Sequence, residues 1–170
     1  DMNRSLLEIA EVLNGQVVTD KSGVVVNGVV TDSRKSTPGT LFFALSGENF
    51  DGHDFVGQAF KAGSVAAVVS RPIEGGPYIK VRDTLVALQK LAAYHRDQYE
   101  IPVIAVTGSV GKTTTKDLLA HCLDGSFLTL KTPGNYNNEI GLPLTLLSLS
   151  DEHQACVIEL AMRSSGEISL

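Results

Sequence analysis

A run of glycine, lysine and threonine residues in the second half of the chain has the composition of a phosphate-binding loop. It reads Thr107-Gly-Ser-Val-Gly-Lys-Thr-Thr114 and lies between an apolar segment and a segment with helical periodicity. Glycine lets backbone N–H groups approach phosphate oxygens closely, and a helix N-terminus adds a partial positive charge. We therefore expect Lys112 to reach the β- and γ-phosphates of a nucleotide and Thr113 to offer its hydroxyl to Mg²⁺. The expected nucleotide-binding residues are Gly108, Ser109, Val110, Gly111, Lys112, Thr113 and Thr114.

This loop departs from the common form of the motif at its first position. Phosphate loops usually have a glycine where this sequence has Val106, and Gly108 supplies the earlier glycine instead. The alternative is a chance glycine-rich turn between a strand and a helix. The order of strand, Gly-Lys-Thr-Thr and helix favours phosphate binding over that alternative.

An acidic residue, Glu159, ends the apolar run Ala155-Cys-Val-Ile158. Ligands of open parallel sheets bind beyond the carboxyl ends of the strands, where a carboxylate beside a phosphate loop can hold Mg²⁺. The alternative is a solvated acid at a strand end. Because a phosphate loop is present, we expect Glu159 to be a metal ligand together with Thr113.

Two further polar segments carry weaker signals. The segment Thr132–Pro143 contains Asn137 and Asn138, whose amides suit either a polar ligand or an ordinary turn, and composition leaves both open. In the first half of the chain, Arg34 follows Thr31-Asp-Ser33 and has the side chain that best matches a diphosphate. Composition alone favours a capped loop with a solvated arginine there. Lys116 and Asp117 are expected on a solvated helix face, and Arg163 has no assigned role.

The elements that position these residues follow from the hydrophobic pattern. The pattern predicts an α/β fold that changes character near residue 100, from a small mixed α/β domain to the first part of a doubly wound, mainly parallel domain that contains the P-loop. Continuous apolar runs at 103–106 and 155–160 predict strands covered on both faces. The second part has about three strands where sheets usually have about five, so we expect it to be incomplete. Helices are expected at 5–14, 54–62, 83–99, 112–123 and, interrupted near Pro143, within 138–147; the other strands are expected at 24–30, 41–45, 65–69, 78–81 and 127–130.

Composition excludes several classes of protein. Lys and Arg number 14 and Asp and Glu number 19, so the net charge of −5 disfavours a partner that is nucleic acid, which needs a basic face. No apolar run approaches the ~20 residues of a membrane span, and the N-terminus lacks the pattern of a signal peptide. We therefore expect a cytoplasmic protein, and a monomer.

Together the motifs resemble the Mur ligases, ATP-dependent amide ligases of bacterial peptidoglycan synthesis, a process that supports cell shape and division. The resemblance lies in Thr31–Arg34, in Asp51-Gly-His-Asp-Phe55 and in the variant loop 107–114, which is the form that this family uses. The segments Gly134–Pro143 and Glu159-Leu160…Gly166-Glu-Ile168 resemble the branch of the family that adds D-alanyl-D-alanine.

The resemblance implies an activity and a division of labour. The activity is the joining of D-alanyl-D-alanine to UDP-N-acetylmuramoyl-tripeptide through an acyl phosphate, with ATP and Mg²⁺ as cofactors. Residues 1–100 match the domain that holds the UDP end of the substrate, and residues 101–170 match the start of the ATPase domain. Ser33, Arg34, Gly47 and His53 match substrate-binding positions, and Lys112, Glu159, Asn137 and Asn138 match catalytic ones.

Two departures limit what the resemblance implies. The family often has glycine where this chain has Ala161. Its carbamylated lysine, its adenine-contacting segment and its C-terminal domain lie beyond the position matched by Leu170, so we expect these 170 residues alone to be inactive. The alternatives are another P-loop NTPase or kinase, although no guanine-reading Asn-Lys-x-Asp is present, and a non-catalytic module that binds UDP-sugars.

Overall fold

The computed structural model of this chain describes residues 2–19, 23–47, 50–134 and 136–161, and it divides into two compact units. The first ends at Leu91 and the second begins at Ala92. The division falls within helix α3 (Thr84–Arg96), before the change near residue 100 that the hydrophobic pattern predicts. Among the described residues, no helix has the length and apolar character needed to cross a bilayer.

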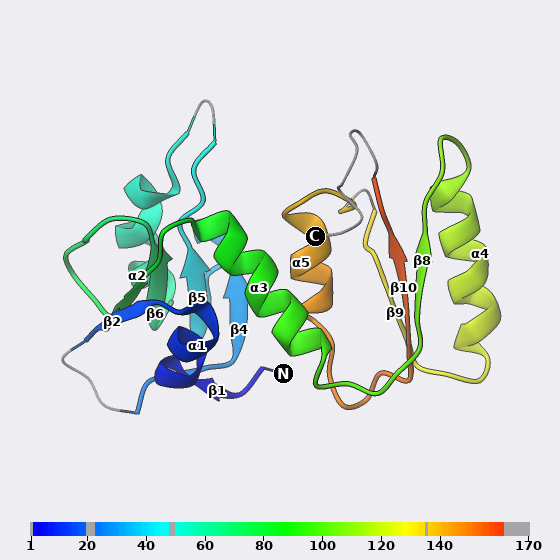
Figure 1. The fold of residues 1–170 in the computed structure, drawn as a ribbon, viewed down its shortest axis with the longest axis horizontal. Helices are drawn as coiled ribbons and strands as arrows, with labels where there is room; N and C mark the ends of the chain where they lie inside the picture. Colours follow the sequence, from blue (N-terminus) through cyan, green and yellow to red (C-terminus); the bar gives the residue numbers. More distant parts are fainter. Residues whose placement is uncertain (1, 20–22, 48–49, 135, 162–170) are drawn as a thin grey trace. The chain divides into compact units, whose positions relative to one another are not determined.

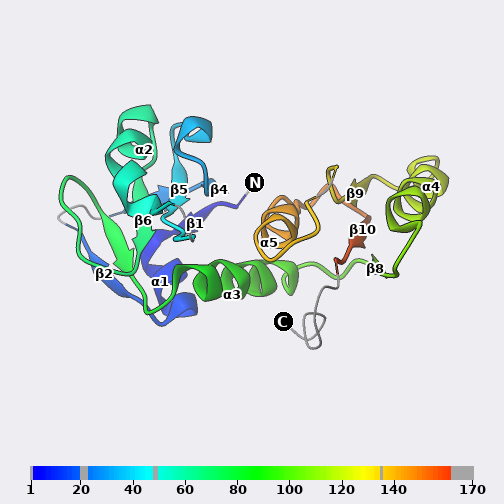
Figure 2. The same ribbon diagram turned by 90° about the horizontal axis from the view of Figure 1, so that it is seen from above.

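The first unit is built on a five-stranded sheet with helices on both faces (Figures 1 and 2). All neighbouring strands are parallel except β2, which runs antiparallel to β7 at one edge. Helix α2 (Val56–Ala62) packs Val56 and Ala59 against one face, in a cluster with Phe42 and Ala67. The sheet order is β2 (Gln16–Val18), β7 (Tyr78–Lys80), β6 (Ala66–Val69), β5 (Thr40–Phe43) and β4 (Gly28–Val30).

Local sequence explains the ends of these elements. Helix α1 (Leu6–Leu13) begins at Ser5, whose hydroxyl accepts the Glu8 N–H, and it ends at Asn14 in the left-handed region rather than at Gly15. Helix α2 ends as expected at Gly63, whose φ of 118° suits glycine. The helix expected from residue 54 begins earlier, as the 3₁₀ turn Gly52–Phe55.

The strand expected over residues 24–30 is wrong as a single element. Strand β3 (Val25–Val26) pairs with β1 (Arg4–Ser5), whereas β4 belongs to the large sheet. Asn27 separates them: its backbone N–H donates to the Gly39 carbonyl, and its side chain donates to the Pro38 carbonyl. An asparagine that bonds to neighbouring backbone in this way ends the ladder of one sheet and starts another.

The second unit has a parallel three-stranded sheet in the order β8 (Val103–Val106), β10 (Ala155–Glu159), β9 (Thr129–Lys131). The expected burial on both faces is confirmed for β10, every residue of which is buried. It is wrong for β8, where Ala105 is exposed. The reason is position: among the described strands β10 is central and β8 is at the edge.

Helices α4 (Lys112–Asp124) and α5 (Gly141–Leu146) also belong to the second unit. Helix α4 packs Ala120 against Val106 and Val157 of the sheet. Pro143 does not interrupt α5 as expected, because it lies in the first turn of that helix, where the missing N–H leaves no hydrogen bond unmade. The first residues expected in strand β9, Phe127 and Leu128, precede it and are exposed.

Candidate nucleotide and metal site

The phosphate loop connects strand β8 to helix α4, as the sequence predicts (Figure 1). Gly108 has a φ of 148° and Gly111 a φ of 80°, so both use backbone conformations that other residues rarely adopt. Gly111 is the N-cap of α4 and provides no side-chain cap, which leaves the first N–H groups of the helix for a ligand. The Lys112 ammonium lies across the loop, with Nζ 2.7 Å from the Gly108 carbonyl oxygen.

Glu159 is the centre of the polar network beside this loop. The Thr113 hydroxyl donates to Oε2 at 2.9 Å, and the Asn137 amide donates to Oε1 at 2.7 Å. The Glu159 backbone N–H donates to the Thr132 hydroxyl at 3.0 Å. The carboxylate is buried, with 2% of the residue exposed. The structure thus brings together residues from helix α4, from the segment after β9 and from the end of β10.

The oxygen atoms that meet at Glu159 are suitable ligands for Mg²⁺. This ion prefers oxygen ligands at about 2.0–2.1 Å in octahedral geometry, so two adjacent ligands lie about 2.9 Å apart. The Thr113 hydroxyl and the Glu159 carboxylate are two such oxygens, separated by 2.9 Å. An ion that replaced the hydrogen bond between them would therefore need little movement of either side chain.

Lys116 lies in this network, and the expectation that it is solvated is wrong. Only 1% of the residue is exposed. Its ammonium donates to the carbonyl oxygens of Thr132 at 3.0 Å and Gly134 at 3.4 Å, and it lies 3.9 Å from Glu159 Oε2. Helical spacing could have predicted this burial, because residues 113, 116 and 120 share one face of a helix. On that face Thr113 lies at the site and Ala120 packs against the sheet, so Lys116, between them, is buried.

The two neighbouring asparagines have different surroundings. The Asn137 side chain reaches Glu159, whereas the Asn138 side chain accepts the backbone N–H groups of Ile140 and Gly141 and so caps the start of α5. The alternatives that composition left open, site chemistry and turn chemistry, are thus divided between the two residues. Asn135, in the same segment, and Arg163 and residues 166–168, in the other matched segment, lie outside the described residues.

In the first unit, Ser33 and Arg34 follow the carboxyl end of β4. The Ser33 hydroxyl is buried and donates to Gln58 of helix α2 at 3.1 Å. The Arg34 guanidinium is exposed and forms a two-pronged contact with Asp32, with Nε 2.9 Å from Oδ1 and Nη2 2.7 Å from Oδ2. These hydrogen bonds lower the pKa of Asp32 to about 2.

The other two candidate residues of this unit, Gly47 and His53, follow the carboxyl end of β5. Both ring nitrogens of His53 have partners: Nδ1 lies 2.6 Å from Asp51 Oδ1, and Nε2 accepts the Ser70 backbone N–H at 3.0 Å. A ring that accepts at Nε2 carries its proton on Nδ1, so His53 is oriented by the protein itself. Gly47 bends the same loop by a hydrogen bond from its N–H to the Phe50 carbonyl. Because β4 and β5 are parallel neighbours, all four candidates lie at the carboxyl ends of the strands, on the same side of the sheet.

Asp51 joins the loops that follow β5 and β6. Its carboxylate accepts the His53 backbone N–H at 2.9 Å, the Arg71 guanidinium at 2.6 Å and the His53 ring. These contacts, the backbone hydrogen bond first, hold the pKa of Asp51 well below that of a free carboxyl.

We expect the variant Asp51→Asn to lose about 1–2 kcal/mol of unfolding free energy, because it weakens charge-assisted hydrogen bonds at a partly exposed site. Since the depressed pKa belongs to the folded state, the contribution is complete above about pH 5 and is lost as the pH falls below about 4. Urea denaturation at pH 7 and pH 3 measures both effects. Asp54→Asn is the control, since Asp54 lies 4.0 Å from Arg71; equal losses in the two variants would contradict this role of Asp51.

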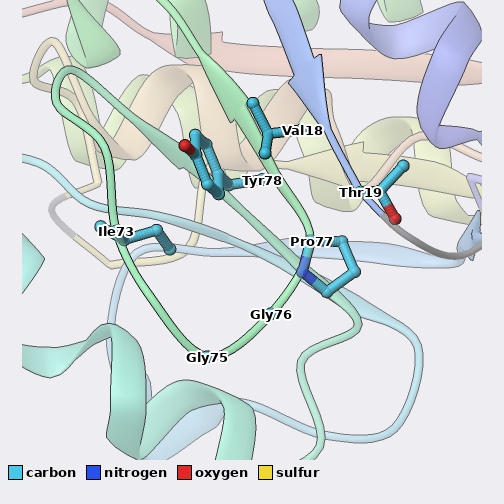
Figure 3. A pocket seen from close by; sticks show the side chains of 7 residues that line it. All are labelled: Val18, Thr19, Ile73, Gly75, Gly76, Pro77 and Tyr78. Atoms are coloured by element: carbon cyan, nitrogen blue, oxygen red, sulfur yellow. The ribbon is translucent and has the colours of Figure 1, made fainter.

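A pocket of about 590 Å³ lies at the other side of the first unit, between the end of β2 and the turn before β7 (Figure 3). Its lining contains none of the candidate residues. The residues that line it are Val18, Thr19, Ile73, Gly75, Gly76, Pro77 and Tyr78.

Comparison with known proteins connects both units to one family. A model of the Mur ligase middle domain matches residues 106–170, and a model of the Mur ligase family catalytic domain matches residues 25–96. A UDP-N-acetylmuramoyl-tripeptide–D-alanyl-D-alanine ligase of Synechocystis is 52% identical over 85% of this chain and 33% of its own length. A ligase of the same name from Escherichia coli is 45% identical over 97% of this chain and 36% of its length.

Solved structures agree with these matches. MurF from Acinetobacter baumannii superposes with a TM-score of 0.91 at 40% identity, over 96% of this chain and 37% of that one. MurF from Thermotoga maritima, solved in complex with ADP, gives a TM-score of 0.78 at 34% identity, over 88% of this chain and 35% of that one. The chain thus spans about a third of the length of the relatives it matches. Since the matched ranges take in both units, including the phosphate loop and Glu159, the chain belongs to the Mur ligase family.

Proposed function

We propose that the full-length protein is the ATP-dependent ligase that joins D-alanyl-D-alanine to UDP-N-acetylmuramoyl-tripeptide, with ADP and phosphate as the other products. The names of the relatives support the choice of substrates. The single observation that carries the proposal is the meeting of Thr113, Asn137 and Glu159 beside a phosphate loop that opens a helix. This arrangement suits ATP and a magnesium ion, and the Thermotoga relative holds ADP.

The second unit supplies some of the groups that act in phosphoryl transfer. Lys112 and the N–H groups at the start of α4 hold the β- and γ-phosphates and stabilise the negative charge that develops on them. Thr113 and Glu159 hold Mg²⁺, which supplies charge neutralisation at the phosphates when bound. Asn137 orients the Glu159 carboxylate by its amide, and Asn138 fixes the end of the same loop by capping α5.

The reaction has two steps. The terminal carboxylate of the tripeptide attacks the γ-phosphorus, the bond to ADP breaks, and an acyl phosphate forms. The amine of D-alanyl-D-alanine then attacks the acyl carbon, the bond to phosphate breaks, and the nitrogen loses a proton. The chain's contribution is positioning and electrostatic stabilisation rather than covalent chemistry.

For the first unit, we propose that residues 1–100 bind the UDP end of the substrate. Ser33, Arg34 and Gly47 follow the carboxyl ends of two neighbouring strands. The exposed Arg34 guanidinium has the shape and charge to bind a diphosphate. His53 stabilises the loops at these strand ends through Asp51 and Ser70, since both of its ring nitrogens have protein partners. Because the reaction consumes ATP, we place the protein in the cytoplasm, and we expect it to act as a monomer without nucleic acid.

The test is amine dependence in the full-length protein. With UDP-N-acetylmuramoyl-tripeptide, ATP and Mg²⁺ present, we expect phosphate release and the amide product, detected by mass spectrometry, only after D-alanyl-D-alanine is added. L-Alanyl-L-alanine is the matched control and should give neither. ADP formation with a phosphorylated product and no need for an amine would identify a kinase, and UDP-sugar binding without any ATP turnover would identify a non-catalytic module.

A further inference from the structure

The Lys116 ammonium is buried where the proposed function gives it no task. A lysine side chain is among the least often buried, and this one is almost wholly enclosed within the second unit. It comes from helix α4, one turn after Thr113. A buried cation is retained at a cost unless its hydrogen bonds and charge are matched, so its partners indicate what it does.

The nearest partners of Lys116 are backbone carbonyls rather than the two nearby carboxylates, Asp117 and Glu159. Nζ lies 3.0 Å from the Thr132 oxygen and 3.4 Å from the Gly134 oxygen, both within hydrogen-bonding range. Two carboxylates lie beyond that range, with Asp117 Oδ1 at 3.7 Å and Glu159 Oε2 at 3.9 Å, so they contribute charge balance without a direct bond. The ammonium therefore fastens the segment that follows strand β9 to helix α4.

That segment also determines where Glu159 lies. Thr132 donates its N–H to the Val157 carbonyl and accepts the Glu159 N–H at its hydroxyl. Five residues after Thr132, the Asn137 amide donates to Glu159 Oε1, and the Asn137 carbonyl accepts the Ala161 N–H. Lys116 thus holds Thr132 and Gly134 to α4, Thr132 holds the Glu159 backbone, and Asn137 holds the Glu159 carboxylate.

We propose that Lys116 is a positioning residue for the metal and nucleotide site. By holding the Thr132 and Gly134 carbonyls against α4, it keeps Asn137 and Glu159 facing Thr113, and it touches neither metal nor nucleotide. The proposal rests on the assignment of Thr113 and Glu159 as magnesium ligands. The charge of Lys116 alone would weaken magnesium binding, because a cation beside Glu159 repels Mg²⁺. The distances from Lys116 to the two carbonyl oxygens are shorter than its distance to the Glu159 carboxylate. We therefore expect its effect on the position of the segment to outweigh its repulsion of Mg²⁺.

The variant Lys116→Met tests the proposal in the full-length protein. It keeps the length of the side chain and removes both the charge and the donors. The probe is a non-hydrolysable ATP analogue with a fluorescent label, titrated once in excess EDTA and once in saturating Mg²⁺. We expect affinity in EDTA to stay within twofold of the wild type, and the gain on adding Mg²⁺ to fall by about tenfold or more. A role confined to stability would weaken both titrations equally.

Lys131→Met is the matched control, because Lys131 ends strand β9 and pairs with Asp117 at the surface. It should keep the wild-type gain from Mg²⁺. An unchanged or increased gain in Lys116→Met would overturn the proposal. If thermal unfolding shows that Lys116→Met is not folded, Lys116→Gln replaces it, because this shorter, neutral side chain cannot hold both carbonyls: a reduced gain supports positioning, and a wild-type gain contradicts it. Absence of any Mg²⁺-dependent gain in the wild type would instead contradict the proposed metal site.

Discussion

Replacement of Lys112 by alanine is expected to reduce turnover by the full-length protein about a thousandfold or more. Loss of one preorganised donor to developing charge typically lowers kcat by about 10²–10³, and Lys112 contributes a full positive charge as well. The ammonium already lies over the loop, 2.7 Å from the Gly108 carbonyl, so the wild-type site needs little rearrangement to receive a phosphate. Phosphate release with all three substrates present measures the effect.

Two controls separate the role of Lys112 from general damage. Calorimetric titration with UDP-N-acetylmuramoyl-tripeptide should give the wild-type affinity, because that ligand is assigned to the first unit. Lys131→Ala, which removes a lysine of the same unit that pairs with Asp117, should leave turnover within about twofold, as expected for an exposed ion pair. Normal turnover by Lys112→Ala would show that the loop does not bind the transferred phosphate.

The second large effect is expected for Glu159→Gln, with turnover lower by about 10²–10³ and a higher Mg²⁺ requirement. The amide keeps the size of the side chain, but it offers only one acceptor oxygen where the carboxylate serves both Thr113 and Asn137. Its NH₂ group would face one of these donors. The substitution also removes one of the two negative charges that lie near the buried Lys116.

A magnesium titration of the turnover rate distinguishes this role from a loss of folding. If Glu159 is a ligand, the variant should need a higher Mg²⁺ concentration for half-maximal rate. Glu152→Gln is the control, since Glu152 is exposed in the turn before β10, and it should titrate like the wild type. An unchanged magnesium requirement in Glu159→Gln would assign the carboxylate to structure alone.

Some of the fold could be predicted from the sequence because its signals are local. Gly63 ends a helix, Asp83 caps α3 by accepting the Leu85 and Val86 N–H groups, and continuous apolar runs mark both β8 and β10. What could not be predicted depends on pairing between distant segments. The runs at β8 and β10 are equally apolar, yet only β10 is buried throughout, because the order of strands is a tertiary property. The short strands β1 and β2 were missed for the same reason.

The candidate site shows the same division. Lys112 and Thr113 follow from the spacing of a motif, and Glu159 follows from its place at a strand end. Lys116 was missed because charge predicts exposure, although the shared helix face with Thr113 indicated otherwise. His53 was expected at the substrate, and one of the two residues that orient its ring, Ser70, lies 17 residues away in the sequence. No local pattern records such contacts.

The strand order of the second unit has a consequence for synthesis on the ribosome. Among the strands described for this unit, the central one, β10, is the last to be made, and β8 and β9 pair with β10 rather than with each other. Chains emerge N-terminal end first, at about 5–20 residues per second. The phosphate loop is therefore translated about 40 residues before the strand that joins β8 to β9, whereas the five-stranded sheet of the first unit is complete once Lys80 has emerged. The nucleotide site is thus a late product of vectorial folding, and a nascent chain stalled before Ala155 presents β8 and β9 without their shared partner.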